Sequence, residues 1–179
     1  AEYLASQGWT VFAGVRKHSV GEPLKQASAN IQPLILDVAK PDQVKAAVET
    51  VSKALGGKTL DGLVNNAGIA VMGPLALQPL DQIEQHFNVN VFGLMRTTQA
   101  CLPLLGMDET REGKPGRIVN ITSVGGRLSS PFLGAYAATK HAVEALTDSL
   151  RRELVIYGID VIAIGPGSVK TPIWDKAED

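Results

Sequence analysis

The sequence of 179 residues is poor in cysteine, has no excess of positive charge and contains no long apolar run. Cys101 is the only cysteine, which excludes a disulfide within the chain and a zinc site built from cysteines. The 17 Lys and Arg residues nearly balance the 18 Asp and Glu residues. This balance argues against a nucleic-acid-binding protein, which normally carries a basic surface. Every apolar stretch is shorter than the roughly 18–20 residues that cross a bilayer, so we predict no membrane span in this segment.

The scarcity of cysteine also indicates the cellular compartment of the protein. A chain without disulfides is typical of a reducing compartment, so we expect a cytoplasmic protein. The length suits one domain spanning residues 1–179, and 45% hydrophobic residues supply its core. The first residue is Ala rather than Met, and residues 1–8 resemble the end of a helix capped by glycine. We therefore expect a piece of a longer protein, and an upstream targeting signal stays open.

What the sequence does contain is a regular alternation of apolar strands and amphipathic helices. Helices are predicted over residues 41–55, from about 81 to 102, and from about 132 to 157. Strands are predicted over residues 9–15, 31–36, 60–65, 117–121 and 159–164. Because the strands are apolar throughout, the pattern predicts an α/β fold with a parallel sheet covered by helices on both faces.

Polar, glycine and proline residues gather where the predicted strands end. Asp37-Val38, Asn65-Asn66-Ala67-Gly68, Thr122-Ser123 and Pro166-Gly167 each follow or close a strand. Ligands of open parallel sheets bind beyond the carboxyl ends of the strands. This distribution favours a nucleotide-like ligand.

Tyr136 and Lys140 stand four residues apart near the start of the last predicted helix, so their side chains share one face. An isolated tyrosine has a pKa near 10 and is a poor base at neutral pH, whereas a neighbouring ammonium favours the phenolate. The pair is a candidate acid/base. Ser123, 13 residues before the tyrosine, is placed to donate a hydrogen bond to a substrate oxygen. Asn90 lies among apolar neighbours in the preceding helix, where a buried amide needs partners.

Taken in order, Asn65-Asn66-Ala67-Gly68, Asn90-x-x-Gly93, Ser123, Tyr136-x-x-x-Lys140 and Pro166-Gly167-x-x-x-Thr171 resemble the short-chain dehydrogenase/reductase family over essentially the whole chain. The segments around Asn90 and Ser123 resemble the branch with hydroxysteroid and retinol dehydrogenases. The resemblance implies a Rossmann-type, doubly wound fold and reversible hydride transfer between a nicotinamide and an alcohol/carbonyl pair.

The same resemblance assigns roles to the four candidate catalytic residues. Tyr136 would exchange a proton with the substrate oxygen, and Ser123 would hold and polarise that oxygen. Lys140 would lower the pKa of the tyrosine and bind the nicotinamide ribose. Asn90 would fix a helix irregularity and a water that links the lysine to solvent. This agrees with the chemistry, since hydride transfer builds negative charge on oxygen.

The resemblance also implies a set of cofactor contacts. Asp37 and Val38 would meet the adenine ring, and Asn65 would brace neighbouring strands. The predicted cofactor-binding residues are Arg16, Asp37, Val38, Asn66, Ala67, Gly68, Tyr136, Lys140, Pro166, Gly167, Val169 and Thr171. No metal site is predicted.

Cofactor choice depends on the end of the first predicted strand. An acidic residue there would bind the ribose 2′-hydroxyl and select NAD. The chain has Val15, Arg16 and Lys17 instead, and a guanidinium is suited to a 2′-phosphate. We therefore favour NADP(H) and keep NAD as possible; the alternative is that Arg16 lies in a solvated turn.

The chain departs from the family pattern at both ends. The family's first strand and its glycine-rich turn are absent, and this strand is central in the family's sheet. Its absence is expected to leave two runs of sheet, each without a partner along one edge. The sequence also stops near residues 171–175, where the family's substrate-covering segment begins.

We interpret His18, His86 and His141 as incidental, because they lack metal-ligand spacing. Five apolar residues are candidates for a substrate pocket, with ordinary packing as the alternative: Met72, Leu75, Leu77, Leu128 and Phe132. The resulting prediction is an NADP(H)-dependent oxidoreductase for an apolar secondary alcohol or ketone. The alternatives are a 3-oxoacyl reductase of the same family and a catalytically silent nucleotide-binding scaffold or regulator. The resemblance further implies a homodimer or homotetramer.

Overall fold

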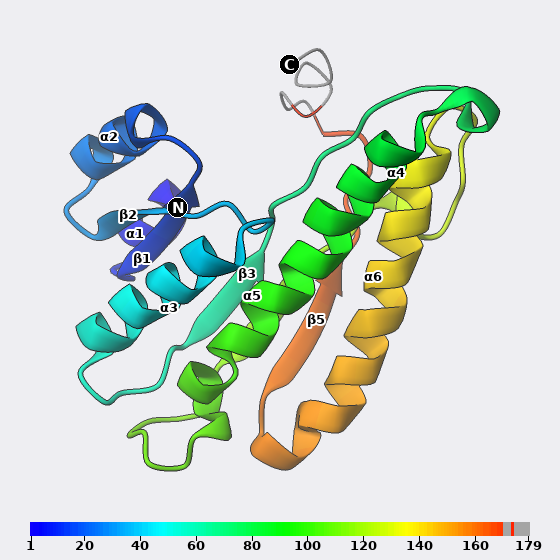
Figure 1. Cartoon of the computed structure of the whole chain (residues 1–179). Helices are drawn as coiled ribbons and strands as arrows, with labels where there is room; N and C mark the ends of the chain where they lie inside the picture. The colour runs from blue at the N-terminus through cyan, green and yellow to red at the C-terminus, as the bar shows by residue number, and fades with distance from the viewer. Residues whose placement is uncertain (170–172, 174–179) are drawn as a thin grey trace. The chain divides into compact units, whose positions relative to one another are not determined.

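The computed structural model of the chain describes residues 1–169 and residue 173. The chain forms two compact units, Ala1–Gly56 and Gly57–Asp179, and the described part of each contains a parallel sheet with helices (Figure 1). Within the described residues, no helix combines the length and apolar character needed to cross a membrane. The predicted α/β class is confirmed.

The first unit has two parallel strands and three helices. Its elements are α1 (Glu2–Ser6), β1 (Val11–Val15), α2 (His18–Ala27), β2 (Ile31–Ile35) and α3 (Pro41–Leu55). Helix α3 starts with proline, whose fixed φ suits the first turn, and ends at Gly56 in the left-handed region, at φ +58°. Val44, Ala47 and Val51 form its buried face, as their spacing predicts.

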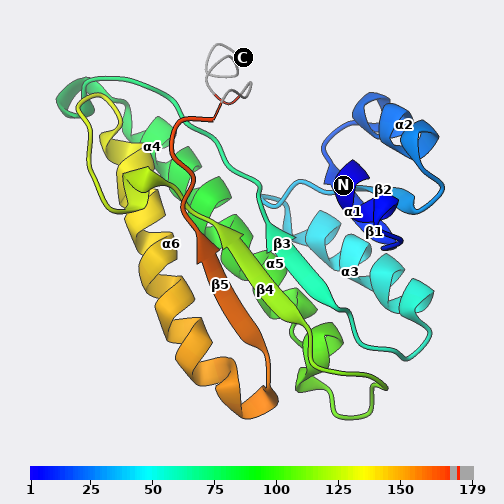
Figure 2. The ribbon, with the colours of Figure 1, turned by 180° about the vertical axis from the view of Figure 1, so that it is seen from behind.

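The second unit has a three-stranded parallel sheet in the order β3-β4-β5. The strands are β3 (Gly62–Asn65), β4 (Arg117–Ile121) and β5 (Asp160–Ile164). The longer helices are α4 (Leu80–Phe87), α5 (Leu94–Cys101) and α6 (Gly134–Glu153), and the short helices are η1 (Leu75–Leu77), η2 (Asn88–Gly93), η3 (Pro103–Met107), η4 (Val124–Gly126) and η5 (Leu154–Tyr157). Helices α4 to α6 lie on one face of this sheet, and the sheet stands in front of them in the reverse view (Figure 2).

The predicted helix from about residue 81 to 102 is interrupted. Between α4 and α5, residues Asn88–Gly93 form a π-helix, the wider turn that occurs mostly at functional sites. This is the helix irregularity that the family resemblance places at Asn90.

The sheet edges follow the sequence expectation as well. Among the described residues, β1 pairs with β2, β3 pairs with β4, and the two sheets share no ladder. Strands β1 and β3 therefore each have one unpaired edge. On the face of the second sheet opposite α4 to α6, Val64, Ile162 and Ile164 are partly exposed, at 53%, 37% and 47%.

Candidate active site

The candidate catalytic residues of the second unit lie where β4 ends and α6 begins. Ser123 follows β4 and caps η4, its Oγ accepting a hydrogen bond from Gly125 N at 3.0 Å. Tyr136 and Lys140 occupy the first two turns of α6 and are both buried. The strand end and the helix start thus bring together residues 13 and 17 positions apart in the sequence.

Lys140 is held beneath the tyrosine. Its Nζ lies 5.7 Å from the centroid of the Tyr136 ring, a distance at which an ammonium is attracted by the ring face. The same Nζ donates to the carbonyl oxygen of Ile121, at the end of β4, at 2.9 Å. Burial lowers the pKa of Lys140 to about 8, because a desolvated ammonium is less stable than a solvated one.

Gly125 lies between the serine and the tyrosine. A Cβ at this glycine would lie 3.3 Å from Tyr136 Cε1 and 3.4 Å from Ser123 Oγ. Both side chains therefore border the same small space, which a larger residue at position 125 would crowd.

Asn90 is 1% exposed and ties three segments together. Its Oδ1 accepts from Ile69 N at 2.9 Å, and its Nδ2 donates to Ile69 O and to Thr139 Oγ1, both at 3.0 Å. Thr139 Oγ1 in turn donates to the carbonyl oxygen of Tyr136 at 2.7 Å. The π-helix is thus joined to the segment after β3 and to the first turn of α6, while the predicted water relay stays a prediction.

The predicted cofactor segments of this unit border the same group. A Cβ on Gly68 would lie 3.5 Å from Asn90 Oδ1 and 3.8 Å from Lys140 Nζ, so the end of the Asn66-Ala67-Gly68 motif passes beside both. The loop after β5 meets η4, because Val124 N donates to Pro166 O at 2.9 Å. Gly167 and Val169 follow in this loop and are exposed. Thr171 lies outside the described residues.

The remaining predicted cofactor residues belong to the first unit. Leu36 N donates to Val15 O, so Arg16 and Asp37 leave the two-stranded sheet at the same edge. Arg16 is exposed. Asp37 N donates to Gln43 Oε1 at 2.8 Å, and its Oδ1 accepts from Ala39 N at 3.0 Å. Val38 is half-buried beside it.

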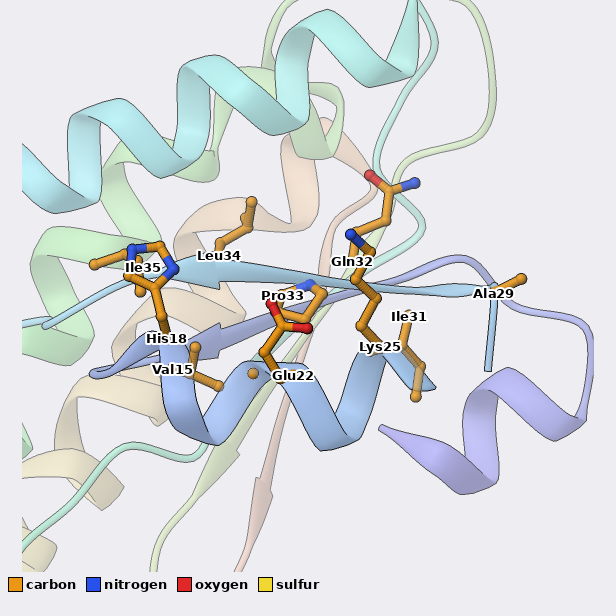
Figure 3. A pocket seen from close by; sticks show the side chains of 11 residues that line it. Val15, His18, Glu22, Lys25, Ala29, Ile31, Gln32, Pro33, Leu34 and Ile35 are labelled. Carbon is orange, nitrogen blue, oxygen red and sulfur yellow. The ribbon is translucent and has the colours of Figure 1, made fainter. Parts of the chain in front are cut away.

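The first unit also has a hollow of about 760 Å³ between α2 and β2. His18, Glu22 and Lys25 project from α2 toward β2 around it (Figure 3). The predicted cofactor-binding residues are not among those that line it.

Sequence reasoning missed several polar residues that support the site. Thr139 precedes Lys140 directly and connects Asn90 to Tyr136. Asn65 was expected to brace strands and does so, because its Nδ2 donates to Asn120 Oδ1 at 2.9 Å, but Asn120 itself carried no signal. The one sequence signal for such residues is a threonine or asparagine that stands within an apolar stretch.

Comparison with known proteins agrees with this geometry. The short chain dehydrogenase family model matches residues 1–179. The chain is 40% identical to the NADPH-dependent 3-dehydrocapnine reductase of Ornithobacterium rhinotracheale, over 99% of this chain and 62% of that protein. It is 39% identical to estradiol 17-beta-dehydrogenase 2 of Mus musculus, over 99% of this chain and 48% of that protein. The chain thus spans about half to three fifths of the length of these relatives.

A solved structure has a similar fold. The 3-ketoacyl-(acyl-carrier-protein) reductase of Brucella melitensis, complexed with NADH, matches with a TM-score of 0.88 and 28% identity. The match covers 98% of this chain and 71% of that one. The ordered motifs, the buried Tyr-Lys pair, the π-helix at Asn90 and the family match lead to one conclusion. The chain belongs to the short-chain dehydrogenase family.

Proposed function

We propose that the protein transfers a hydride between NADP(H) and the carbon of an apolar secondary alcohol or ketone. In the reducing direction a ketone, NADPH and a proton give the alcohol and NADP⁺. The observation that carries this proposal is the buried pair in α6, with Lys140 Nζ beneath the Tyr136 ring and Ser123 Oγ across Gly125 from that ring.

The residues present fit a nicotinamide dinucleotide. Lys140 Nζ has three hydrogens to donate, and within the described residues it has one hydrogen-bond acceptor, Ile121 O. Two donors therefore stay available for ribose hydroxyls. Asn66 and Ala67 are exposed at the end of β3, where the small alanine leaves the backbone accessible. The cofactor, when bound, supplies the hydride.

The side chains of the site stabilise the negative charge on the substrate oxygen and supply the proton that it receives. Negative charge grows on the substrate oxygen during reduction, and the Tyr136 hydroxyl gives that oxygen its proton. Ser123 Oγ accepts from Gly125 N, which holds its position and leaves its own hydrogen to donate to the substrate oxygen. The Lys140 ammonium, 5.7 Å from the ring, stabilises the tyrosinate that remains. Asn90 and Thr139 keep the first turn of α6 in place.

The preference for the phosphorylated cofactor rests on the first unit. Arg16 is exposed at the end of β1, and its neighbours Val15 and Lys17 include no carboxylate that would repel a 2′-phosphate. The name of the bacterial relative as NADPH-dependent supports the same choice. NADH stays a possible second cofactor, in line with the ligand of the Brucella structure.

An apolar substrate is favoured by the loops beside Tyr136. Gly73 N donates to Phe132 O at 2.9 Å, which joins the loop after β3 to the loop before α6. Met72, Leu75 and Phe132 on these loops are 58%, 53% and 56% exposed. They present apolar surface at the point where a substrate would approach. The name of estradiol 17-beta-dehydrogenase 2, a relative, supports a substrate of this class.

The test is a panel of carbonyl compounds assayed with NADPH and NADH on the whole protein and on Tyr136→Phe. Removal of the proton donor is expected to lower kcat by about 1000-fold and to leave NADPH binding intact, measured by cofactor fluorescence. Turnover of apolar ketones supports the proposal. Turnover of 3-oxoacyl thioesters alone would identify a 3-oxoacyl reductase, and cofactor binding without any turnover would identify a silent scaffold.

Two further expectations stay predictions. Light scattering of the whole protein tests the homodimer or homotetramer, and cell fractionation tests the cytoplasmic location.

A further inference from the structure

The segment after the Asn66-Ala67-Gly68 motif is held at every second residue. Ile69 N donates to Asn90 Oδ1, Val71 N to His86 Nε2 and Gly73 N to Phe132 O, each at 2.9 Å. Successive alternate amides point the same way in extended backbone, as they would toward a neighbouring strand. Here two acceptors are side chains of α4 and η2, and the third is a loop carbonyl.

His86 supplies the middle acceptor and is fully buried, at 0% exposure. It lies on α4, one turn before Asn90. Its Nδ1 lies 2.7 Å from the carbonyl oxygen of Gln82, so Nδ1 carries the hydrogen and Nε2 is the acceptor for Val71. The ring thus makes one bond within its own helix and one to the segment. His86 is interpreted as incidental from its spacing in the sequence, and the structure shows a buried ring with a contact at each nitrogen.

The two ends of this segment lie beside different parts of the candidate site. At one end Gly68 passes beside Asn90 and Lys140. At the other end Gly73 is bonded to Phe132, four residues before Tyr136. Phe132 has a φ of +65°, which is rare and strained for an aromatic residue. This conformation is the one in which its carbonyl reaches Gly73.

The substrate-side end is also closely packed. A Cβ on Gly134 would lie 2.7 Å from Leu75 Cδ2, so Leu75 sits directly over the first residue of α6. A displacement of residues 71–75 therefore moves the apolar side chains at the start of α6, whereas Ile69, the neighbour of Gly68, stays bonded to Asn90.

We propose that His86 is a positioning residue for the carbonyl substrate, acting through its hydrogen bond to Val71 N. This inference rests on the proposed function, because it assigns the residues near Met72 and Leu75 to the substrate side of that same site. Without the acceptor, the amide of Val71 loses its partner and residues 71–75 become free to shift. We expect the KM for the ketone to rise about tenfold, as for the loss of one hydrogen bond to a partly buried group. The kcat and the affinity for NADPH are expected to stay within about twofold of the wild type, since Tyr136, Lys140 and Gly68 keep their contacts.

The competing explanation is that His86 serves α4 alone, through its bond to Gln82 O. Two amide variants separate the explanations. The amide of His86→Gln can reach the position of Nε2 and accept from Val71 N, whereas the shorter His86→Asn reaches only the position of Nδ1 and Gln82 O. His86→Leu removes both bonds and keeps the apolar volume.

The experiment measures KM and kcat with NADPH and an apolar ketone, together with amide hydrogen exchange at Val71 without cofactor. The proposal predicts near-normal KM and a protected Val71 amide in His86→Gln. In His86→Asn it predicts a raised KM and a faster-exchanging Val71 amide. Equal behaviour of the two amide variants would overturn the proposal, and so would a raised KM with unchanged exchange at Val71. If His86→Leu does not fold, the amide pair still decides.

His141→Gln is the matched control. Its Nδ1 lies 2.9 Å from Ala137 O, the same within-helix contact on the exposed side of α6, and it should change neither readout. The Tyr136→Phe result keeps this test separate from the proposed function. If wild-type protein turns over no carbonyl compound, the proposed function fails and exchange at Val71 still reports whether His86 holds the segment. If Tyr136→Phe is inactive and His86→Asn is unchanged, only the His86 proposal fails.

Discussion

The two units differ in what they bury. In the first unit the buried side chains of the described residues are all apolar, and Val44 on α3 and Ile31 on β2 are among them. All 11 buried polar or charged side chains of the described residues lie in the second unit. Among the predicted binding residues of the first unit, Arg16 is exposed and Asp37 is half-buried.

This difference matches two kinds of task. A charged group that selects a phosphate works at the surface, where the ligand arrives and where a long side chain can adapt. A group that transfers a proton needs a fixed position and a desolvated environment that changes its pKa. The surroundings of Tyr136, the candidate proton donor, are desolvated in this way, because burial lowers the pKa of the neighbouring Lys140 to about 8.

A buried polar network gives the second unit its frame. Asn65 Nδ2 donates to Thr98 Oγ1 and to Asn120 Oδ1, and Asn120 Nδ2 donates to Thr147 Oγ1, each at 2.9 Å. These bonds join β3 and β4 to α5 and α6. Because each member is satisfied by another, the network fixes α6, the helix that carries the candidate catalytic pair.

The largest expected effect on the folded state concerns the pH dependence contributed by Lys140. Its pKa is about 8 in the folded protein against 10.5 ordinarily, so between these values the unfolded chain holds the proton and the folded chain has released it. Folding stability from this group therefore rises with pH across the window from about 8 to 10.5, by roughly 3 kcal/mol in total. Below pH 8 the buried ammonium is a constant destabilising contribution.

Urea unfolding of wild type and Lys140→Met at several pH values from 7 to 10.5 measures this contribution. The stability of the wild type relative to the variant should increase over that range. A stability difference that does not change with pH would mean that the second unit does not desolvate Lys140. The proposed contrast between the two units would then be contradicted.

The next effect concerns the buried network. Asn120→Ala removes one hydrogen bond from Asn65 and one from Thr147, and we expect the free energy of unfolding to fall by about 2 kcal/mol. Arg117→Ala on the same strand removes an ion pair to Asp160 in which both side chains are more than half exposed, with an expected loss of less than about 1 kcal/mol. Chemical denaturation of both variants compares buried with exposed polar contacts on one strand. Equal losses of unfolding free energy in the two variants would contradict the proposal that the buried network stabilises the second unit.

The smallest effect tests the surface groups of the first unit. Arg16→Ala should raise the KM for NADPH about tenfold, as for the loss of a hydrogen bond to a charged group, and leave the KM for NADH nearly unchanged. Lys25→Ala, on α2, removes an exposed positive charge and should alter neither KM. Equal losses for the two cofactors in Arg16→Ala would refute the assignment to the 2′-phosphate.

Much of the fold and of the site was predictable from local patterns. Strand β4 was predicted over 117–121, where it lies, and α3 over 41–55, because an initial proline and two closing glycines bound that helix. Strand β1 begins at Val11, two residues later than the apolar run, since hydropathy does not mark where a ladder starts. The candidate catalytic residues were predicted from a shared helix face and an ordered family motif, and their catalytic roles stay a prediction.

The rest depends on contacts that no spacing reports. His86 matters through Val71, 15 residues earlier, and its role exists only once α4 packs against the segment after β3. The π-helix at Asn88–Gly93 is equally invisible to periodicity, because one wider turn barely changes the pattern of apolar residues. Phe132 could not be recognised as strained, since aromatic side chains give no sign of a positive φ.

The three bonds to Ile69, Val71 and Gly73 have an evolutionary consequence. Each acceptor holds an amide hydrogen and makes no use of the side chain that the residue carries. Proline, which lacks that hydrogen, is therefore excluded at positions 69, 71 and 73. Exposed neighbours such as Met72 are open to replacement. The exposed side chains of this segment can thus vary while the backbone beneath them keeps its place.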